Sequence, residues 1–436
     1  MSTSRLAVDI GGTFTDLVLE TASRSWSIKL LTTPAAPEEA VLEGARRILT
    51  EAGVAPREVG LVVHGTTLAT NALIERKGAR TALVTTAGLR DSVEIAWEHR
   101  FDQYDLLMER PEPLVPRNLR LGVPERIAAD GAVLLPLDEA ALRAAAAELR
   151  AAAVQSLAVC FLHSFTNEAH ERRAGAILAA ELPGVALSLS CEVAPEIREY
   201  ERASTTIANA YVRPLMDRYL GGLEDGLRAI GISGPLLLMM SSGGVTTVET
   251  ARRFPVRLVE SGPAGGAILA QHIAAENGLD RAVAFDMGGT TAKLTLLDGL
   301  ELQRSRQFEV ARAYRFIGGS GLPVRIPVIE LVEIGAGGGS IARADALGRI
   351  GVGPDSAGSV PGPACYARGG TDPTVTDADA ALGRLDPGRF AGGSIPLDLD
   401  RAAAALAGLG AALGLNAAGA AAGVAEIVDE TMASAA

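Results

Sequence analysis

Asp9-Ile-Gly-Gly-Thr13 and Asp286-Met-Gly-Gly-Thr290 are two copies of one short pattern, 277 positions apart. Each copy follows a short apolar stretch and leads into another, which predicts a strand, a glycine turn and a second strand. A single Gly-Gly-Thr after a strand is usually only a hairpin turn. Two copies with the same aspartate in the same setting instead indicate a pair of phosphate-binding loops, one in each half of the chain.

The chemistry of such a loop explains its residue types. Adjacent glycines let the backbone approach a ligand with no Cβ in the way, and successive N–H groups can converge on phosphate oxygens. A threonine hydroxyl adds a donor, and an aspartate at the strand end is an oxygen ligand for Mg²⁺. We therefore expect Asp9 and Asp286 to be catalytic carboxylates and metal ligands, with phosphate contacts from Gly11, Gly12, Thr13, Thr15, Gly288, Gly289, Thr290 and Thr291.

The two copies differ three residues after the shared threonine, where Asp16 corresponds to Lys293. Asp16 is a candidate for holding a metal or positioning water, and Lys293 is a candidate for neutralising phosphate charge. The alternative for both is a solvated strand residue. The repeat therefore predicts two similar loops with a break in symmetry at this position.

Other candidates come from single motifs. His64 precedes Gly65-Thr-Thr67 and is either a general acid or base or a turn histidine bonded to local backbone. Gly337 and Gly338, in Gly335-Ala-Gly-Gly-Gly-Ser340, are expected to approach a nucleotide or substrate. Asp372, Asp377 and Asp379 form a carboxylate cluster that is more typical of helix and turn caps than of a metal site.

Composition narrows the function classes. The formal net charge of −12 argues against nucleic acid or an anionic membrane as the main partner. Three separated cysteines, without a Cys-x-x-Cys pair, indicate reduced thiols and a cytoplasmic location. No uninterrupted apolar stretch of about 18 residues predicts a membrane span. The chain also lacks the Gly-x-x-x-x-Gly-Lys-Ser/Thr pattern of a Walker loop.

With 436 residues the chain is about twice the size of a single hydrophobic core, so two domains or lobes around a cleft are expected. An antiparallel meander is predicted at the start and a long helix over residues 196–227, which would bridge the lobes. The segment 100–125 reads as a loop. The predicted helices include 37–53, 138–153, 167–182 and 401–436.

The chain resembles the A subunit of the hydantoinase/oxoprolinase family over almost its whole length. The matching stretches are Val8–Asp16, Val63–Thr67 with Ala69–Ala72, Glu199–Thr206 with Asn209–Pro214, Ser241–Gly244, Glu260–Gly266, Asp286–Lys293, Glu333–Ser340 and Pro361–Tyr366 with Pro373–Asp377. The family's ATP-binding fold is shared with actin, Hsp70, hexokinase and acetate kinase. The resemblance therefore implies a two-lobed α/β, ribonuclease H-like ATPase fold.

The same resemblance implies where the lobes lie. Residues 1–195 would form the N-terminal lobe with the first phosphate loop, and residues 196–436 the second lobe with the second loop. Family members run past this length and carry a further Gly-Gly-Ala-Gly-Pro motif in the adenosine-binding part, which this sequence lacks. The expectation is thus a C-terminally truncated chain with an incomplete second lobe.

The activity that the resemblance implies is an ATP- and Mg²⁺-dependent opening of a cyclic amide such as a hydantoin or 5-oxoproline. Phosphorylation of the ring carbonyl oxygen would activate it, and a partner B subunit would hydrolyse the product, within a hetero-oligomer. Two alternatives stay open: an A-type subunit of an acetone carboxylase-like complex, and an inactive truncated fragment that binds nucleotide weakly or not at all. A sugar kinase fits the motifs less well.

Overall fold

The computed structural model describes residues 4–12, 14–33, 35–98, 100–108, 110–312, 318–393 and 395–435. The chain opens with three strands, β1 (Ser4–Ile10), β2 (Phe14–Glu20) and β3 (Ser25–Leu31), which pair antiparallel in succession. In β1 buried and exposed residues alternate strictly, as in a strand with one face in the core. The predicted antiparallel meander is therefore confirmed.

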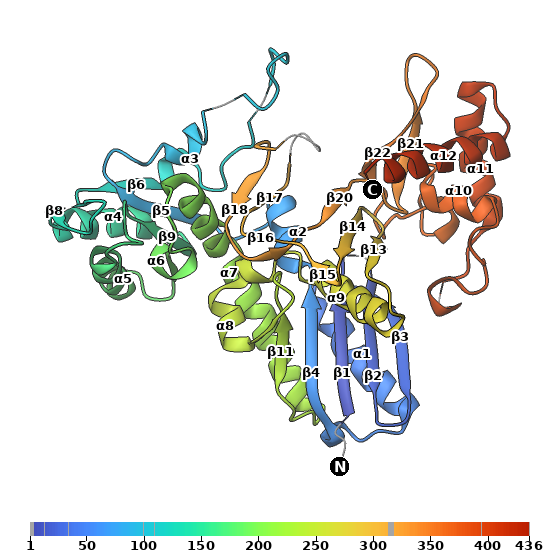
Figure 1. The fold of residues 1–436 in the computed structure, drawn as a ribbon, viewed down its shortest axis with the longest axis horizontal. Helices are drawn as coiled ribbons and strands as arrows, with labels where there is room; N and C mark the ends of the chain where they lie inside the picture. The colour runs from blue at the N-terminus through green and yellow to red at the C-terminus, as the bar shows by residue number, and fades with distance from the viewer. Residues whose placement is uncertain are drawn as a thin grey trace.

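Later segments extend this first sheet. β4 (Val59–Thr66) pairs parallel with β1, β11 (Leu236–Met239) pairs parallel with β4, and β12 (Val245–Thr247) pairs antiparallel with β11. The order is β12-β11-β4-β1-β2-β3, and Figure 1 labels the strands from β11 to β3 at its lower centre. Helix α1 (Pro37–Ala52) packs Ile48 and Ala45 into the same core as Leu6 and Leu17.

A second, four-stranded sheet is entirely parallel. Its order is β10 (Ala186–Leu189), β9 (Ser156–Cys160), β5 (Thr81–Thr86) and β6 (Arg120–Val123). β5 and β9 are buried along their whole length, as is usual when helices cover a parallel sheet. The segment 100–125, expected as a loop, thus contains β6, a short strand that pairs with β5 rather than standing alone.

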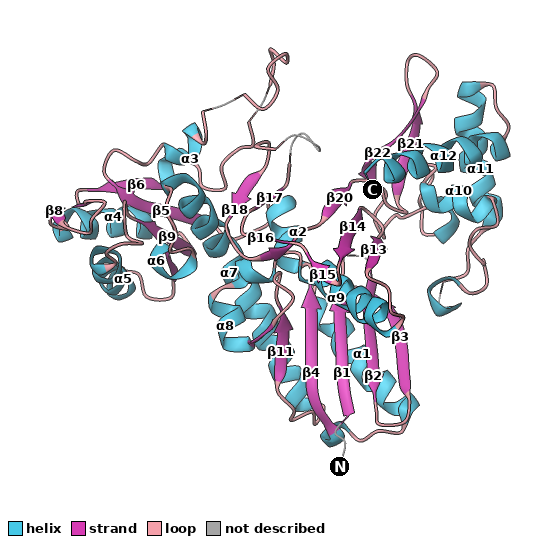
Figure 2. Cartoon of the chain, in the orientation of Figure 1, coloured by secondary structure: helices cyan, strands magenta, loops and turns pink. Residues whose placement is uncertain are grey.

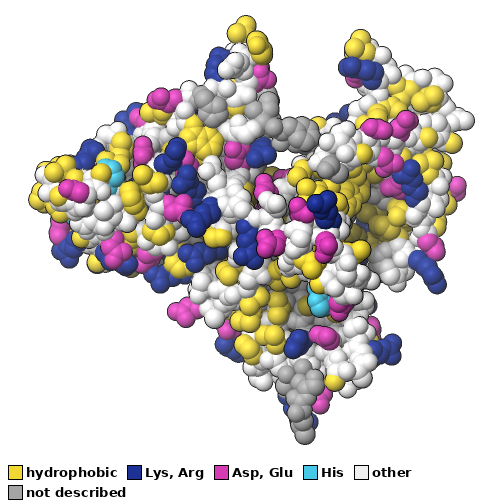
Figure 3. All heavy atoms as spheres, in the orientation of Figure 1, with side chains coloured by type: hydrophobic (Ala, Val, Ile, Leu, Met, Phe, Trp, Pro, Cys, Tyr) yellow, Lys and Arg dark blue, Asp and Glu magenta, His cyan; other side chains and the backbone are white. Residues whose placement is uncertain are grey.

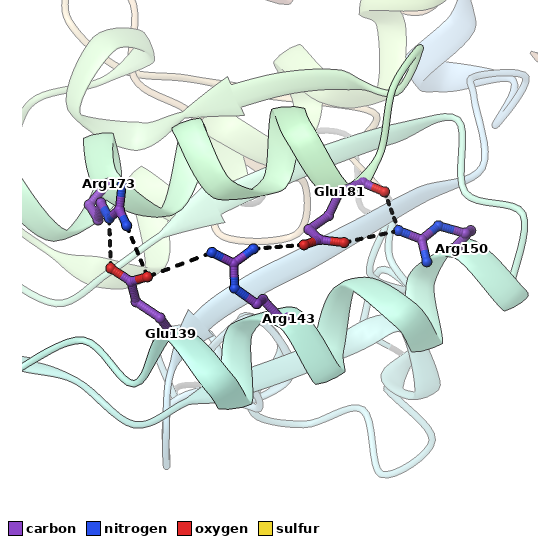
Figure 4. Close-up of polar contacts among 5 residues, drawn as sticks. All are labelled: Glu139, Arg143, Arg150, Arg173 and Glu181. Atoms are coloured by element: carbon purple, nitrogen blue, oxygen red, sulfur yellow. Dashed lines mark hydrogen bonds and ion pairs between the residues drawn. The ribbon is translucent and has the colours of Figure 1, made fainter.

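Two helices beside this sheet, α4 (Glu139–Ala151) and α5 (Ala169–Glu181), are joined by a row of surface ion pairs. Arg143 reaches Glu181 at 2.7 Å and Arg173 reaches Glu139 at 2.6 Å (Figure 4). Exposed pairs of this kind contribute about 0–1 kcal/mol each. The row therefore adds little to the free energy of folding.

The long helix α7 (Glu199–Ala229) joins the two sheets. Its first half contributes Ala203 and Ile207 to the core of the parallel sheet, and its second half contributes Met216 and Leu220 to the core of the first sheet. The expected long helix is therefore present, and it connects these two cores (Figure 2).

A third sheet carries the second glycine pattern. β13 (Arg281–Met287) pairs antiparallel with β14 (Ala292–Asp298), which also pairs with β15 (Glu301–Leu302) and β20 (Val332–Ile334). Helix α9 (Ser261–Glu276) packs between this sheet and β4. Exposed apolar side chains gather here (Figure 3), among them Leu269, Ile273, Val283, Phe285, Met287 and Leu296.

The remaining elements are short. The paired strands are β7 (Arg126–Ile127) with β8 (Val133–Leu135), β16 (Arg304–Ser305) with β19 (Val328–Ile329), β17 (Phe308–Val310) with β18 (Leu322–Val324), and β21 (Ser340–Ala344) with β22 (Ile350–Ser356). The short helices are α2 (Leu68–Ile74), α3 (Ser92–Ile95), α6 (Ser190–Val193) and α8 (Val248–Arg253).

The C-terminal unit is a group of helices packed against β21 and β22: α10 (Val375–Ala381), α11 (Leu399–Leu413) and α12 (Ala417–Ala435). The single helix expected over 401–436 is two helices, because Gly414 ends α11 in the left-handed conformation (φ 70°). Within the described ranges no single helix is long and apolar enough to cross a membrane. α11 and α12 pass that test only as a pair bent by 86°.

The first sheet continues past residue 195, where a boundary was expected. β11 and β12, which follow residue 196, belong to the sheet that carries the first glycine pattern. A division at 195/196 would separate them from β4, to which β11 is hydrogen-bonded. The sheet with the second pattern begins only at β13.

Asp377 holds the start of the C-terminal unit together. It is fully buried, and its carboxylate accepts hydrogen bonds from the N–H groups of Ala364, Cys365 and Thr374 and from the Thr374 hydroxyl. In return Thr374 caps α10. The cap interpretation of the Asp372–Asp379 cluster therefore describes Asp377.

Replacing Asp377 by alanine should lower the free energy of unfolding by about 3 kcal/mol, because four donors would be left without their acceptor in the interior. Urea unfolding monitored by circular dichroism measures this. Asp372→Ala, at an exposed position in the same segment, is the matched control and should change stability by about 0.5 kcal/mol or less. Equal effects of the two substitutions would contradict this account.

Candidate functional site

The two glycine patterns fold into the same turn. In the first, Asp9 lies opposite Asp16 across β1 and β2, and the N–H of Gly11 donates to the carbonyl of Phe14 at 2.8 Å. In the second, Asp286 lies opposite Lys293, and the N–H of Gly288 donates to the carbonyl of Thr291 at 2.9 Å. The repeat seen in the sequence is therefore a repeat of backbone geometry.

Asp9 is enclosed by backbone from two neighbouring elements. A Cβ at Gly65, on β4, would lie 2.9 Å from the Asp9 Oδ1 atom, and a Cβ at Gly262, in the first turn of α9, would lie 3.2 Å from it. A side chain at Gly65 would therefore force the Asp9 carboxylate to move. The start of α9 and the end of β4 therefore meet beside this carboxylate, which stays open to solvent.

Electrostatics connect the two patterns. The pKa of Asp9 is raised above its ordinary value, first because protein atoms replace part of the surrounding water and then because Asp16 and Asp286 carry like charge nearby. Lys29 opposes this shift and holds the Asp16 carboxylate at 2.6 and 2.7 Å. The Asp286 charge of the second loop is thus one of the causes of the raised pKa of Asp9 in the first.

Lys293 forms an ion pair with Glu260, and both side chains are mostly buried. Glu260 stands just before α9 in the left-handed conformation, and its N–H donates to the Thr70 hydroxyl on α2. The next residue, Ser261, donates its hydroxyl to the carbonyl of Thr66 on β4. Lys293 is therefore tied, through this segment, to the first sheet.

The expected phosphate contacts divide into accessible and buried groups. Gly12 and Thr290 are exposed, and Gly289 and Thr291 are half-buried. Thr15 is fully buried, and its hydroxyl lies 3.0 Å from that of Thr32. Thr13 lies outside the described residues.

Gly337 and Gly338 lie against the second turn. The N–H of Gly338 donates to the carbonyl of Gly288 at 3.0 Å, and the N–H of Gly339 donates to that of Gly289 at 2.7 Å. These two N–H groups are thus used within the protein. The structure places this segment against the second turn, and the nucleotide contact of Gly337 and Gly338 stays a prediction.

The structure does not bring His64 to the carboxylates. His64 pairs with Val8 in the sheet while Gly65 pairs with Asp9, so the His64 side chain and Asp9 point to opposite faces. The ring is fully buried between the Val8 carbonyl, 3.3 Å from Nδ1, and the Tyr219 hydroxyl, 2.7 Å from Nε2. A carbonyl only accepts, so Nδ1 carries the proton and Nε2 accepts from Tyr219.

Sequence reasoning missed several groups around the two turns. Thr32 donates its hydroxyl to the carbonyl of Gly11 at 2.9 Å, Lys29 neutralises Asp16, and Glu260 pairs with Lys293. None of these three residues belongs to the glycine patterns, and no local signal marks Thr32. The cysteines are buried and without disulfide partners, and burial raises the pKa of each thiol.

The donor set is rich in oxygen. Within the described part of the chain no group of three or more His, Cys, Asp and Glu side chains is arranged to hold a metal ion by itself. Two aspartates from separate loops, with turns that present backbone N–H groups, instead suit a ligand that brings both negative charge and its own cation.

Comparison with known proteins places the chain in a family. The model of the hydantoinase/oxoprolinase family matches residues 202–436, and that of the hydantoinase/oxoprolinase N-terminal region matches residues 5–182. The chain therefore belongs to the hydantoinase/oxoprolinase family.

Several relatives are described. The caprolactamase subunit alpha of Pseudomonas jessenii is 39% identical over 99% of this chain and 62% of its own length, and 5-oxoprolinase of Saccharomyces cerevisiae is 33% identical over 88% and 32%. The crystal structure of the ATP-dependent caprolactamase superposes with a TM-score of 0.81 at 38% identity, covering 99% of this chain and 62% of that one. Nucleotide-free acetone carboxylase gives a TM-score of 0.84 at 27% identity with the same two coverages. The mixed α/β fold is thus that of these enzymes, and the chain spans less than two thirds of their length.

The environment of His64 predicts a pH dependence. Burial lowers its pKa from 6.5 to about 4, so the folded protein keeps the ring neutral while the unfolded chain takes up a proton below pH 6.5. The stability that His64 contributes is therefore complete above pH 6.5 and is lost as the pH falls towards 4. By pH 5 the loss should reach about 2 kcal/mol.

Urea unfolding gives the free energy of unfolding at pH 7 and at pH 5. The contribution of His64 is the decrease between these pH values in the wild type minus the decrease in His64→Gln. His272→Gln removes an exposed histidine and should retain the wild-type dependence. If His64→Gln lost as much free energy of unfolding between pH 7 and pH 5 as the wild type does, the buried neutral ring would not cause that loss.

Proposed function

We propose that this chain binds Mg·ATP between its two glycine turns and uses it to phosphorylate the carbonyl oxygen of a cyclic amide. The observation that carries the proposal is the duplicated turn, with Gly11 and Gly288 bonded alike and with Asp9 and Asp286 within electrostatic reach. Phosphoryl transfer needs chiefly positioning and neutralisation of charge, which two facing loops supply.

The residues present fit both ATP and Mg²⁺. Asp9 and Asp286 offer carboxylate oxygens, and Mg²⁺ is usually held by one or two carboxylates together with phosphates and water. The turns offer N–H groups at Gly12, Gly289 and Thr290. When bound, the metal ion would neutralise the charge that develops on the transferred phosphoryl group. Asp16, neutralised by Lys29, would orient water from the side.

The reaction balances as a coupled hydrolysis. The amide oxygen takes the γ-phosphoryl group, ADP leaves, and the ring carbon becomes an activated imidate. Addition of water then releases phosphate and opens the ring to an amino acid. The second step would take place on a B-type partner subunit, in keeping with relatives that are themselves subunits, and the hetero-oligomer would work in the cytoplasm.

The proposed architecture is the two-lobed ATPase fold of actin, Hsp70 and hexokinase. Its support is the strand order β3-β2-β1-β4-β11, in which three antiparallel strands are followed by two parallel ones. The β13–β14 hairpin repeats the β1–β2 hairpin in the second lobe. On the topology, the first lobe extends to about residue 260.

One other function has a specific observation in its favour. The acetone carboxylase structure superposes slightly better than the caprolactamase structure, although its sequence is less similar. A carboxylase subunit would phosphorylate an enolate oxygen in place of an amide oxygen. The same assay separates the two.

The test measures ATP hydrolysis by the chain, alone and with its partner subunit, in the presence of caprolactam, 5-oxoproline, hydantoin or acetone with bicarbonate. We expect stimulation by one cyclic amide and a loss of about 100-fold or more in Asp9→Asn and Asp286→Asn, because each removes a charge that holds the metal. Asp298→Asn, an exposed aspartate at the far end of β14, should keep wild-type turnover.

Stimulation by acetone with bicarbonate alone would favour the carboxylase alternative. Turnover that survives in both Asp9→Asn and Asp286→Asn would sink the assignment of the loops. A wild-type chain that neither binds nor hydrolyses ATP would identify it as an inactive fragment.

A further inference from the structure

In each glycine turn the carbonyl of the first glycine accepts a hydrogen bond from a residue outside the turn. In the first turn the Thr32 hydroxyl donates to the Gly11 carbonyl at 2.9 Å. In the second turn the N–H of Gly338 donates to the Gly288 carbonyl at 3.0 Å. Gly11 and Gly288 occupy the same place in the two patterns, so unrelated donors perform one task.

The planarity of the peptide bond gives this task a direction. In a trans peptide the carbonyl of one residue and the N–H of the next point in opposite directions. A donor that fixes the Gly11 carbonyl therefore turns the Gly12 N–H the other way, and the donor to the Gly288 carbonyl does the same for Gly289. The bond from Gly339 to the Gly289 carbonyl extends the effect to Thr290.

The N–H groups turned outward in this way are available to a ligand. Among the residues that the structure describes, those of Gly12, Gly289 and Thr290 donate to no protein acceptor. Gly12 and Thr290 are exposed and Gly289 is half-buried. Convergent backbone N–H groups of this kind bind phosphate oxygens.

The Gly337–Gly339 segment packs too closely against the second turn to accept a side chain at Gly337 or Gly339. A Cβ at Gly337 would lie 2.7 Å from the Thr290 backbone, and one at Gly339 would lie 2.7 Å from the Ser356 hydroxyl. Neither glycine has a positive φ, so glycine is needed here for space and not for conformation. The Thr376 hydroxyl and N–H both donate to the Gly338 carbonyl and brace the segment in turn.

The support behind the first turn is a pair of hydroxyls. Thr32 follows β3 directly, and its one proton is used on the Gly11 carbonyl. The hydrogen bond of 3.0 Å between Thr15 and Thr32 therefore runs from the Thr15 hydroxyl to the Thr32 oxygen. The Thr15 side chain is fully buried, and its hydroxyl is linked to the Gly11 carbonyl through Thr32.

We infer that Thr32 and the Gly337–Gly339 segment are positioning residues that set the direction of the phosphate-binding N–H groups in the first and second loop respectively. The inference rests on the proposed function, since it assigns these N–H groups to the phosphates of ATP. Two of the glycine-rich motifs, at Gly11-Gly12 and Gly288-Gly289, would then bind the ligand. The third, Gly337–Gly339, would orient the second of these two loops.

Thr32→Val tests the first loop, because it removes the hydroxyl and keeps the shape. The affinity for Mg·ATP and for Mg·tripolyphosphate, which has no nucleoside, should fall about fivefold in both cases. Amide hydrogen exchange of the ligand-free protein should become faster over the peptide that contains Gly11 and Gly12. Thr32→Ser keeps the donor and should restore both measurements.

Thr33→Val is the matched control. Thr33 is the next residue, is exposed, and donates its hydroxyl to the Ala36 carbonyl, away from the turn. It should leave phosphate affinity unchanged. If Thr33→Val weakened binding as much as Thr32→Val, or if Thr32→Val bound both ligands as tightly as the wild type, the positioning role would be overturned.

Gly337→Ala tests the second loop, and Gly351→Ala is its control, since a Cβ at Gly351 would meet nothing closer than 4.0 Å. Crowding at Gly337 should displace Thr290 and lower the affinity for Mg·ATP and for Mg·tripolyphosphate by more than tenfold. Gly351→Ala should bind both ligands with the wild-type affinity. A wild-type chain that binds neither ligand would refute the proposed function and this inference together. Normal wild-type binding with unaffected Thr32→Val and Gly337→Ala variants would refute only the inference.

Discussion

The approach of two carboxylates, Asp9 at the end of β1 and Asp286 at the end of β13, is the constraint on which the rest of the molecule depends. Burial and, after it, the like charges of Asp16 and Asp286 raise the pKa of Asp9 and disfavour its ionised form. The fold tolerates this because β1 and β13 are each fixed by their sheets, and because α9 packs against both β4 and β13. Lys29 and Lys293 bring positive charge to the same region, each bound to its own acidic partner.

Local features of this arrangement could be predicted from the sequence. The strands on either side of each Gly-Gly pair, the turn that joins them and the first helix all depend on residues close in sequence. The structure has these elements where the sequence pattern predicted them. The pairing of Asp9 with Asp16 and of Asp286 with Lys293 also follows from the length of the turn. The family could be identified for the same reason, since its motifs are short and contiguous.

Features that depend on distant residues could not be predicted. The Thr32 hydroxyl lies 21 positions from the carbonyl that it binds, and Gly338 meets Gly288 only because β20 pairs with β14. His64 reads as a residue of the site because it precedes a glycine, yet the register of β4 turns it into the core against Tyr219. For a similar reason the sequence did not show that β11 returns to the first sheet after a long helix.

Strand β13 forms an unpaired edge of the third sheet within the described residues. Within the described residues β13 is hydrogen-bonded on one side only, to β14, and it exposes Val283, Phe285 and Met287. An open strand edge with apolar side chains is a template to which other strands can add. Within the described fold this strand, which also carries one of the two aspartates, is therefore a place where a further strand can add to the sheet.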